Sequence, residues 1–127
     1  MVVDASALLE FILATPRDSV IRDAIGDSQM VAPDLITVEV LSTLRRLVRQ
    51  SLLSDSRAEQ AVADLLDAPI HYFSALPLAT VIWQLRHNLA AYDATYIALA
   101  ATLDCALVSR DTRLARAPNL PIRILVP

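Results

Sequence analysis

Short uninterrupted apolar runs alternate with longer stretches in which apolar residues recur at helical spacing, and this pattern predicts an α/β domain. The apolar runs predict strands at residues 1–3, 30–32, 70–73, 106–109 and 122–126. Helical spacing predicts helices at residues 6–13, 18–25, 34–50, 54–67, 77–87 and 91–103. Because strands alternate with helices, we expect a mostly parallel sheet that is covered by helices on both faces.

Capping residues and helix breakers indicate where several of these elements end. Ser6 and Ser54 suit helix N-caps, and Pro33 suits the first turn of the long helix. Gly26, the only glycine, is expected in the left-handed conformation that closes a short helix. On the long helix Glu39 lies opposite the apolar stripe, which by itself predicts a solvent-exposed face.

Length and composition predict one domain that spans residues 1–127. Of the 127 residues 55% are hydrophobic, which is enough for one packed core, and no stretch has the composition of a linker. No apolar stretch reaches the ~20 residues that a bilayer crossing needs, and no signal peptide precedes Asp4. We therefore expect no membrane association and a cytoplasmic location.

The inventory of reactive side chains excludes several classes of enzyme. His71 and His87 lack Cys or His partners at metal-ligand spacing, and Cys105 lies in an apolar run typical of a core residue. All 11 basic residues are arginine, which excludes mechanisms that need a lysine, such as that of phosphoacceptor receiver domains. The net charge of −3 gives no global electrostatic argument for nucleic-acid binding.

Four acids remain as candidates for chemistry. Asp4 directly follows the first predicted strand and Asp111 follows the fourth, at the strand ends where open α/β sheets bind ligands. Asp93 is the only charged residue of an apolar helix, which predicts a carboxylate that faces the interior without a basic partner. Taken singly, each acid could instead be a helix cap or turn residue or, for Glu39, a solvated side chain.

Together these residues resemble the PIN-domain family, and specifically the VapC-type toxins of bacterial toxin–antitoxin pairs. The resemblance runs nearly from end to end and rests on four segments in the family's order. They are Val-Val-Asp4-Ala-Ser6, residues 32–46 around Glu39, residues 89–100 with Tyr92-Asp93-Ala-Thr-Tyr96, and Leu107-Val-Ser-Arg-Asp111-Thr-Arg. The resemblance implies a PIN-like three-layer α/β/α fold with a short, mostly parallel central sheet.

The resemblance also implies that Asp4, Glu39, Asp93 and Asp111 are the catalytic and metal-binding residues of a ribonuclease. Asp4 and Asp93 would be direct ligands, while Glu39 and Asp111 would complete the shell or hold metal-bound waters. A site made of carboxylates suits Mg²⁺ or Mn²⁺, which would orient and deprotonate a water for attack on an RNA phosphodiester.

Two positions depart from the family's pattern. Ser42 stands where Asn is common, and Ser109 stands where Thr is common. Both keep a hydrogen-bonding oxygen, so the departures put rate and substrate choice in question more than activity. Together with Ser6, these serines are expected to contact ligand oxygens or phosphate.

The substrate RNA would be bound by arginines at the rim of the site, and the candidates are Arg46, Arg110, Arg113 and Arg116. The resemblance further implies a homodimer and a cognate VapB-type antitoxin that occludes the site in a toxin–antitoxin hetero-oligomer.

Two other functions stay open, namely a non-catalytic interaction protein on the PIN fold and a housekeeping RNA-processing PIN nuclease. The interaction proteins usually lack one or more of the acids, and all four are present here. A phosphatase of the haloacid-dehalogenase type would need a second Asp at the position of Ser6, and also a lysine.

Overall fold

The computed structural model describes residues 1–127 and contains a five-stranded, all-parallel sheet in the order β3-β2-β1-β4-β5. The strands are β1 (Val2–Val3), β2 (Met30–Pro33), β3 (Ile70–Phe73), β4 (Leu107–Val108) and β5 (Ile124–Leu125). The central strand is β1, which pairs with β2 on one side and with β4 on the other. The predicted α/β class and parallel sheet are therefore confirmed.

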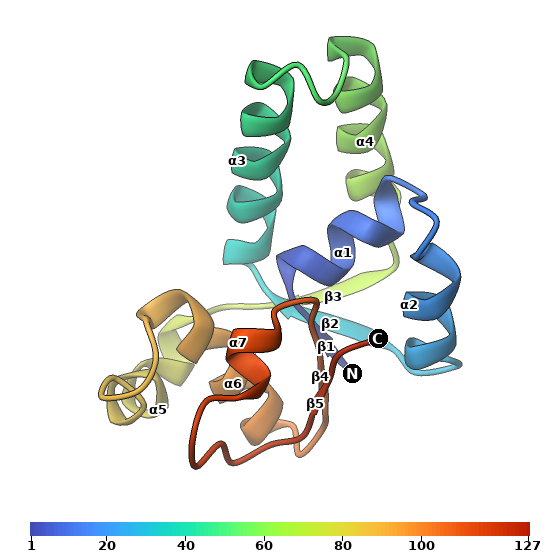
Figure 1. Cartoon of the computed structure of the whole chain (residues 1–127). Helices are drawn as coiled ribbons and strands as arrows, with labels where there is room; N and C mark the ends of the chain where they lie inside the picture. The colour runs from blue at the N-terminus through green and yellow to red at the C-terminus, as the bar shows by residue number, and fades with distance from the viewer.

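Helices cover the sheet and form the outer layers of the domain (Figure 1). They are α1 (Ala5–Ile12), α2 (Asp18–Ile25), α3 (Leu35–Arg49), α4 (Asp55–Asp67), the 3₁₀ helix η1 (Leu76–Leu78), α5 (Ala79–Gln84), α6 (Ala91–Thr102) and α7 (Thr112–Ala115). One group, α1 to α4, packs together, and α3 and α4 form a hairpin that extends beyond the sheet at the top of Figure 1. The helix α6 packs across β1, β2 and β4 and also contacts α5.

The most buried helix is α6, because it covers three strands of the sheet. Every residue from Ala94 to Ala100 is buried, and the single charged side chain, Asp93, lies in the first turn. The residues from Tyr96 to Ala100 belong to a continuous apolar core of 25 buried side chains. Neither α6 nor any other helix combines the length and apolar character that a membrane crossing requires.

Several predicted element ends differ from the structure. The N-cap of α1 is Asp4 rather than Ser6, and Pro33 ends β2 rather than opening α3. The predicted helix at 77–87 is divided into η1 and α5, because its proline lies in a 3₁₀ turn. The sequence pattern does not predict α7, since four residues are too few to show helical periodicity.

One predicted cap is confirmed in full and another in part. Gly26 follows α2 with the expected positive φ of 55°, but its ψ of −135° lies outside the left-handed helical region. Ser54 accepts a hydrogen bond from the backbone N–H of Arg57 at 3.1 Å, and this bond satisfies one free donor at the start of α4.

Candidate active site

Asp4 lies nearly buried, at 7% exposure, where β1 turns into α1. Its Oδ1 accepts hydrogen bonds from the backbone N–H of Ala7 at 3.0 Å and from the hydroxyl of Ser6 at 2.5 Å. The carboxylate therefore caps α1, and the positive end of the helix dipole favours its charge. Its orientation is fixed by groups only two and three residues away.

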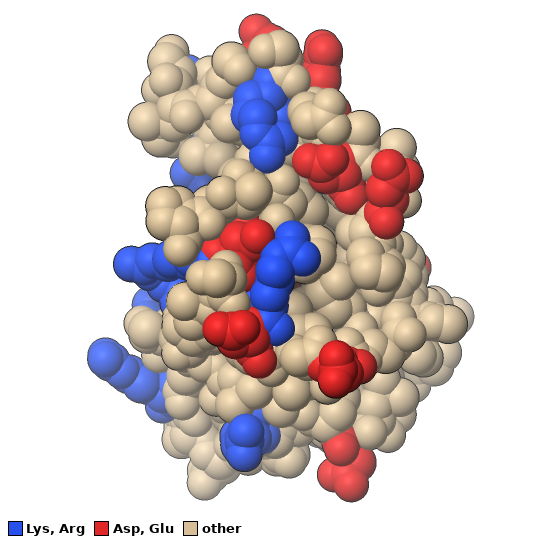
Figure 2. Space-filling model, turned by 90° about the vertical axis from the view of Figure 1, so that its right-hand side faces the viewer, with Lys and Arg blue, Asp and Glu red and all other residues tan.

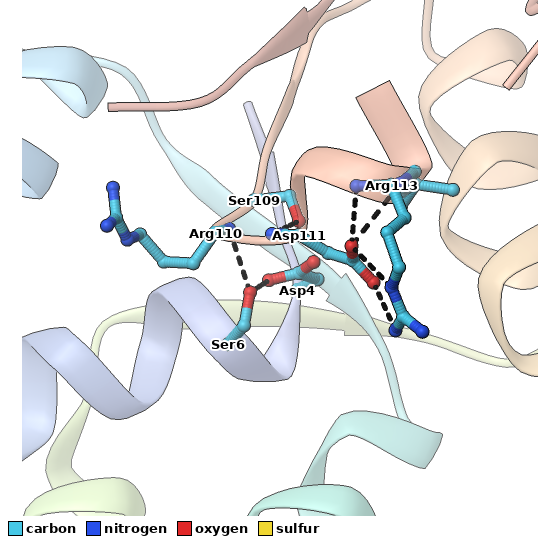
Figure 3. Close-up of polar contacts among 7 residues, drawn as sticks. Asp4, Ser6, Ser109, Arg110, Asp111 and Arg113 are labelled. Atoms are coloured by element: carbon cyan, nitrogen blue, oxygen red, sulfur yellow. Dashed lines mark hydrogen bonds and ion pairs between the residues drawn. The ribbon is translucent and has the colours of Figure 1, made fainter. Parts of the chain in front are cut away.

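Hydroxyl groups tie the loop after β4 to the start of α1 (Figure 3). The backbone N–H of Arg110 donates to Ser6 Oγ at 2.8 Å, and the backbone N–H of Asp111 donates to Ser109 Oγ at 2.9 Å. Burial raises the pKa of the Asp4 carboxyl, and hydrogen bonds with Ser109 and Ser6 only partly offset this rise. Because β1 and β4 are adjacent parallel strands, these contacts gather Asp4 and Asp111 at one edge of the sheet.

Asp111 caps α7 and also forms an ion pair with Arg113 (Figure 3). Its Oδ1 accepts hydrogen bonds from the backbone N–H groups of Arg113 at 2.8 Å and Leu114 at 3.4 Å. The Arg113 guanidinium donates from Nε to Oδ1 at 3.3 Å and from Nη2 to Oδ2 at 3.1 Å. The guanidinium and the backbone donors hold the pKa of Asp111 below its ordinary value.

Glu39 is held by Tyr96, which connects α3 to α6. Tyr96 is buried, and its hydroxyl donates to Glu39 Oε1 at 2.8 Å. The face around Glu39, expected to be exposed, is therefore partly covered at this position. The helical pattern of α3 could not show this, because the covering residue comes from a helix that follows much later in the chain.

Asp93 lies in the first turn of α6, is partly buried and accepts no hydrogen bond from the protein. Burial raises the pKa of its carboxyl, and the negative charges of Asp111 and Asp4 raise this pKa further. Its carboxylate has no neutralising partner in direct contact, which is costly for a partly buried charge.

The four acids belong to one electrostatic unit. Burial is the largest cause of the raised pKa values of Asp4 and Glu39, and the charges of Asp4 and Asp93 raise the pKa of Glu39 further. The charge of Asp111 in turn raises the pKa of Asp93. Carboxylates from four separate segments therefore repel one another. A site of this kind favours a bound cation.

The donor chemistry of this site fits a hard divalent cation, because it offers carboxylate and hydroxyl oxygens without nitrogen or sulfur. As the side chains lie in the structure, no group of three or more acids is arranged to hold a metal ion. Both oxygens of Asp111 already accept hydrogen bonds, and Oδ2 accepts its bond from Arg113. Asp93 is free of such bonds, so the acids differ in how readily they could become ligands.

The other predicted site residues lie around this cluster. Ser42 and Arg46 are exposed on α3, where they line a polar hollow of about 490 Å³. Arg110 pairs with Glu10 at 3.8 Å, and Figure 3 shows its side chain pointing away from Asp4 and Asp111. Arg116 is exposed just after α7 and forms no ion pair. Ser42 makes no hydrogen bond to the acids, in contrast to Ser6.

Tyr96 and Arg113 contact the acids, and neither contact was predicted from the sequence. Tyr96 comes three residues after Asp93 on the same helix, and a hydroxyl inside an apolar helix needs a partner. Arg113 comes two residues after Asp111, within reach of a capping carboxylate. These spacings are the signals from which both contacts could have been inferred.

Comparison with known proteins gives consistent matches. The PIN domain matches residues 1–120. Ribonuclease VapC1 of Mycobacterium tuberculosis is 39% identical over 126 residues, which cover 97% of this chain and 94% of that protein.

Two solved structures share the fold at low sequence identity. The crystal structure of VapBC2 from Rickettsia felis bound to a promoter DNA fragment has a TM-score of 0.69 at 10% identity, covering 98% of this chain and 96% of the other. Mycobacterium tuberculosis VapC20, described as a Sarcin-Ricin loop cleaving toxin, has a TM-score of 0.67 at 18% identity, covering 96% of this chain and 98% of the other.

The raised pKa values of Asp4, Glu39 and Asp93 predict how the stability of the metal-free protein depends on pH. These carboxyls hold protons more tightly in the folded chain than in the unfolded chain, so the unfolding free energy should fall as pH rises from about 4 through the raised pKa values. Asp93→Asn should flatten this fall and raise the melting temperature at neutral pH in EDTA.

Thermal melts across a pH series test this expectation, with Asp23→Asn as the matched control, because Asp23 is exposed on α2 and forms no ion pair. If Asp93→Asn melts below the wild type in EDTA while the control does not, Asp93 acts as a structural helix acid and not as a member of a repulsive cluster.

Proposed function

Because this chain belongs to the PIN-domain family, we propose that it is a metal-dependent ribonuclease that acts as the toxin of a toxin–antitoxin pair. The observation that carries this proposal is the cluster of mutually repelling carboxylates Asp4, Glu39, Asp93 and Asp111. The 39% identical relative is a ribonuclease, which supports hydrolysis of RNA as the reaction.

We propose that Mg²⁺ or Mn²⁺ binds to Asp4 and Asp93, with Glu39 and Asp111 completing the site. Such an ion supplies positive charge and activates a water for attack on a phosphodiester. The chain's own contribution is orientation: Ser6 holds Asp4, and the residue that holds Glu39 is the buried Tyr96. Fixed hydrogen-bonding partners of this kind keep ligands in place and tune metal affinity.

The proposed protein partner is a VapB-type antitoxin that occludes the carboxylate site. VapBC2 of Rickettsia felis, which shares the fold, supports a partner of this class. A housekeeping PIN nuclease would cleave RNA without arresting growth, and a non-catalytic interaction protein would not cleave at all. Activity and growth effect together therefore separate the three functions.

We propose that the bound RNA strand extends from the carboxylate site along α3. Arg46 comes seven residues after Glu39, which places it on the same helix face about 10 Å farther along. Arg45 and Arg49 line the same polar hollow as Arg46, and none of the three forms an ion pair. These free positive charges suit the phosphates of a single RNA strand.

The neighbouring helix α4 has the opposite charge, because its charged residues are Arg57 and the acids Asp55, Glu59, Asp64 and Asp67. Figure 2 shows Asp and Glu side chains gathered on the upper part of the face that lies to the right in Figure 1, at the height of α4. The charges of the hairpin are thus asymmetric, which favours α3 over α4 as the RNA-binding side.

We propose that the homodimer forms through the apolar surface around η1 and α5. Leu76 is 81% exposed, and Trp83 and Tyr92 are each 67% exposed. The only charged residue that lines the hollow there is Arg86, whose guanidinium carbon lies 4.5 Å from the centre of the Trp83 ring. A nearly uncharged apolar surface can face a second copy of itself without repulsion, as a twofold interface requires.

Asp93→Asn tests the proposed activity, because it removes a proposed ligand while keeping the size of the side chain. Purified protein free of antitoxin should cleave RNA when Mg²⁺ or Mn²⁺ is added, and the variant should lose at least ~100-fold in rate, more than an outer-shell partner contributes. Expression of the wild type alone should arrest bacterial growth. Near wild-type cleavage by the variant would refute the ligand assignment, and Asp23→Asn controls for charge.

Arg46→Glu tests the RNA path along α3. In the inactive Asp93→Asn background it should weaken binding of a labelled RNA oligonucleotide and reduce the salt dependence by roughly 0.7 units of slope per lost phosphate contact. Arg17→Glu is the control, because Arg17 is exposed at the start of α2 and unpaired. Equal losses from both substitutions would show that only the net charge matters.

Trp83→Asp tests the dimer surface by light scattering coupled to size exclusion. The wild type should elute as a dimer and the variant as a monomer, since a charge would be buried against its own copy. Leu66→Asp on α4 is the matched control, because Leu66 is 79% exposed but lies outside the proposed surface. A dimer that survives Trp83→Asp places the interface elsewhere.

A further inference from the structure

The two carboxylate oxygens of Asp111 have different hydrogen-bond partners. Oδ1 caps α7, since it accepts the backbone N–H groups of Arg113 and Leu114. Oδ2 has no backbone donor, and its only hydrogen bond comes from Arg113 Nη2 at 3.1 Å. The arginine side chain also donates from Nε to Oδ1 at 3.3 Å, but Oδ2, the oxygen that α7 does not need, is bonded by the arginine alone.

The position of the guanidinium makes this contact reversible. The Arg113 side chain is 90% exposed, whereas the Asp111 side chain is 28% exposed, so the arginine is the more solvated partner of the pair. Figure 3 shows its guanidinium beside Asp111, on the side away from Ser6. Exposed ion pairs contribute little to stability, because both charges are well solvated when apart. Leaving Asp111 costs Arg113 little, and Oδ1 can remain on the backbone of α7 while Oδ2 becomes free.

We propose that Arg113 is a built-in counter-ion that holds Asp111 Oδ2 in the metal-free protein and must be displaced before this acid can serve a metal ion. The inference rests on the proposed function, because it presumes a cation at the four carboxylates. It assigns Arg113 a positioning role that acts through Asp111.

Displacement leaves a charged guanidinium at the rim of the site. Arg113 always carries its charge and presents donors that match two phosphate oxygens. A phosphate of the bound RNA can therefore take the place of Asp111 as its partner. Metal binding and substrate binding would then favour each other, because both stabilise the arrangement in which the Asp111–Arg113 pair is open.

The test is titration of the free protein with Mn²⁺ by calorimetry. Arg113→Gln should bind Mn²⁺ about two- to five-fold more tightly than the wild type, which is the range that an exposed ion pair allows. The difference should shrink at high salt, where the competing pair is already screened. Arg116→Gln is the matched control, because Arg116 adjoins α7, is exposed and forms no ion pair.

Metal-free melting gives a second measurement. Arg113→Gln should melt below the wild type in EDTA, because Asp111 then adds an uncompensated charge to the cluster, and saturating Mn²⁺ should remove the difference. Equal Mn²⁺ affinities of wild type and Arg113→Gln, or equal gains from Arg113→Gln and Arg116→Gln, would overturn the counter-ion role alone. Absence of Mn²⁺ binding in all three proteins would overturn the proposed metal site and this inference with it.

Discussion

The parallel pairing of β1 with β4 is the constraint on which the rest of the structure depends. Val2 and Val3 lie beside Leu107 and Val108, so the residues that follow each strand emerge at the same edge of the sheet. Asp4 leaves one strand and Asp111 leaves the other shortly after it ends. Because both strands run in the same direction, acids separated by more than a hundred positions in sequence become neighbours.

Bringing carboxylates together creates a repulsion that the surrounding groups moderate. Hydroxyls of Ser6 and Ser109 and the N-terminus of α1 stabilise charge on Asp4, and Tyr96 does the same for Glu39. These partners are neutral, so they orient the acids without cancelling the field that attracts a cation. Arg113 is the exception, and it is also the most exposed member of the group. The site thus combines fixed neutral contacts with one replaceable charged contact.

The sequence allowed much of this arrangement to be predicted, for physical reasons that differ from residue to residue. Asp93 could be selected because a single charge in an apolar helix is costly, and Asp4 and Asp111 because they follow strands. Glu39 could not be selected from periodicity, since its burial depends on Tyr96 from another helix.

Local competition between polar groups limited the prediction in a different way. Ser6 and Asp4 both suit an N-cap, and the carboxylate took that position while the hydroxyl bonded to it and to the loop after β4. The apolar pattern did not predict the short helix α7, because its stability depends on the cap and not on a repeating apolar pattern. Such contacts depend on which strands become neighbours, and spacing alone does not give that information.

The central place of β1 in the sheet has a consequence for how the chain is made. During synthesis β1 leaves the ribosome about a hundred residues before β4, one of its two neighbouring strands. Until β4 and Asp111 have been synthesised, one edge of β1 is unpaired and the set of acids is incomplete. A chain that terminates before Asp111 would therefore lack part of the cluster.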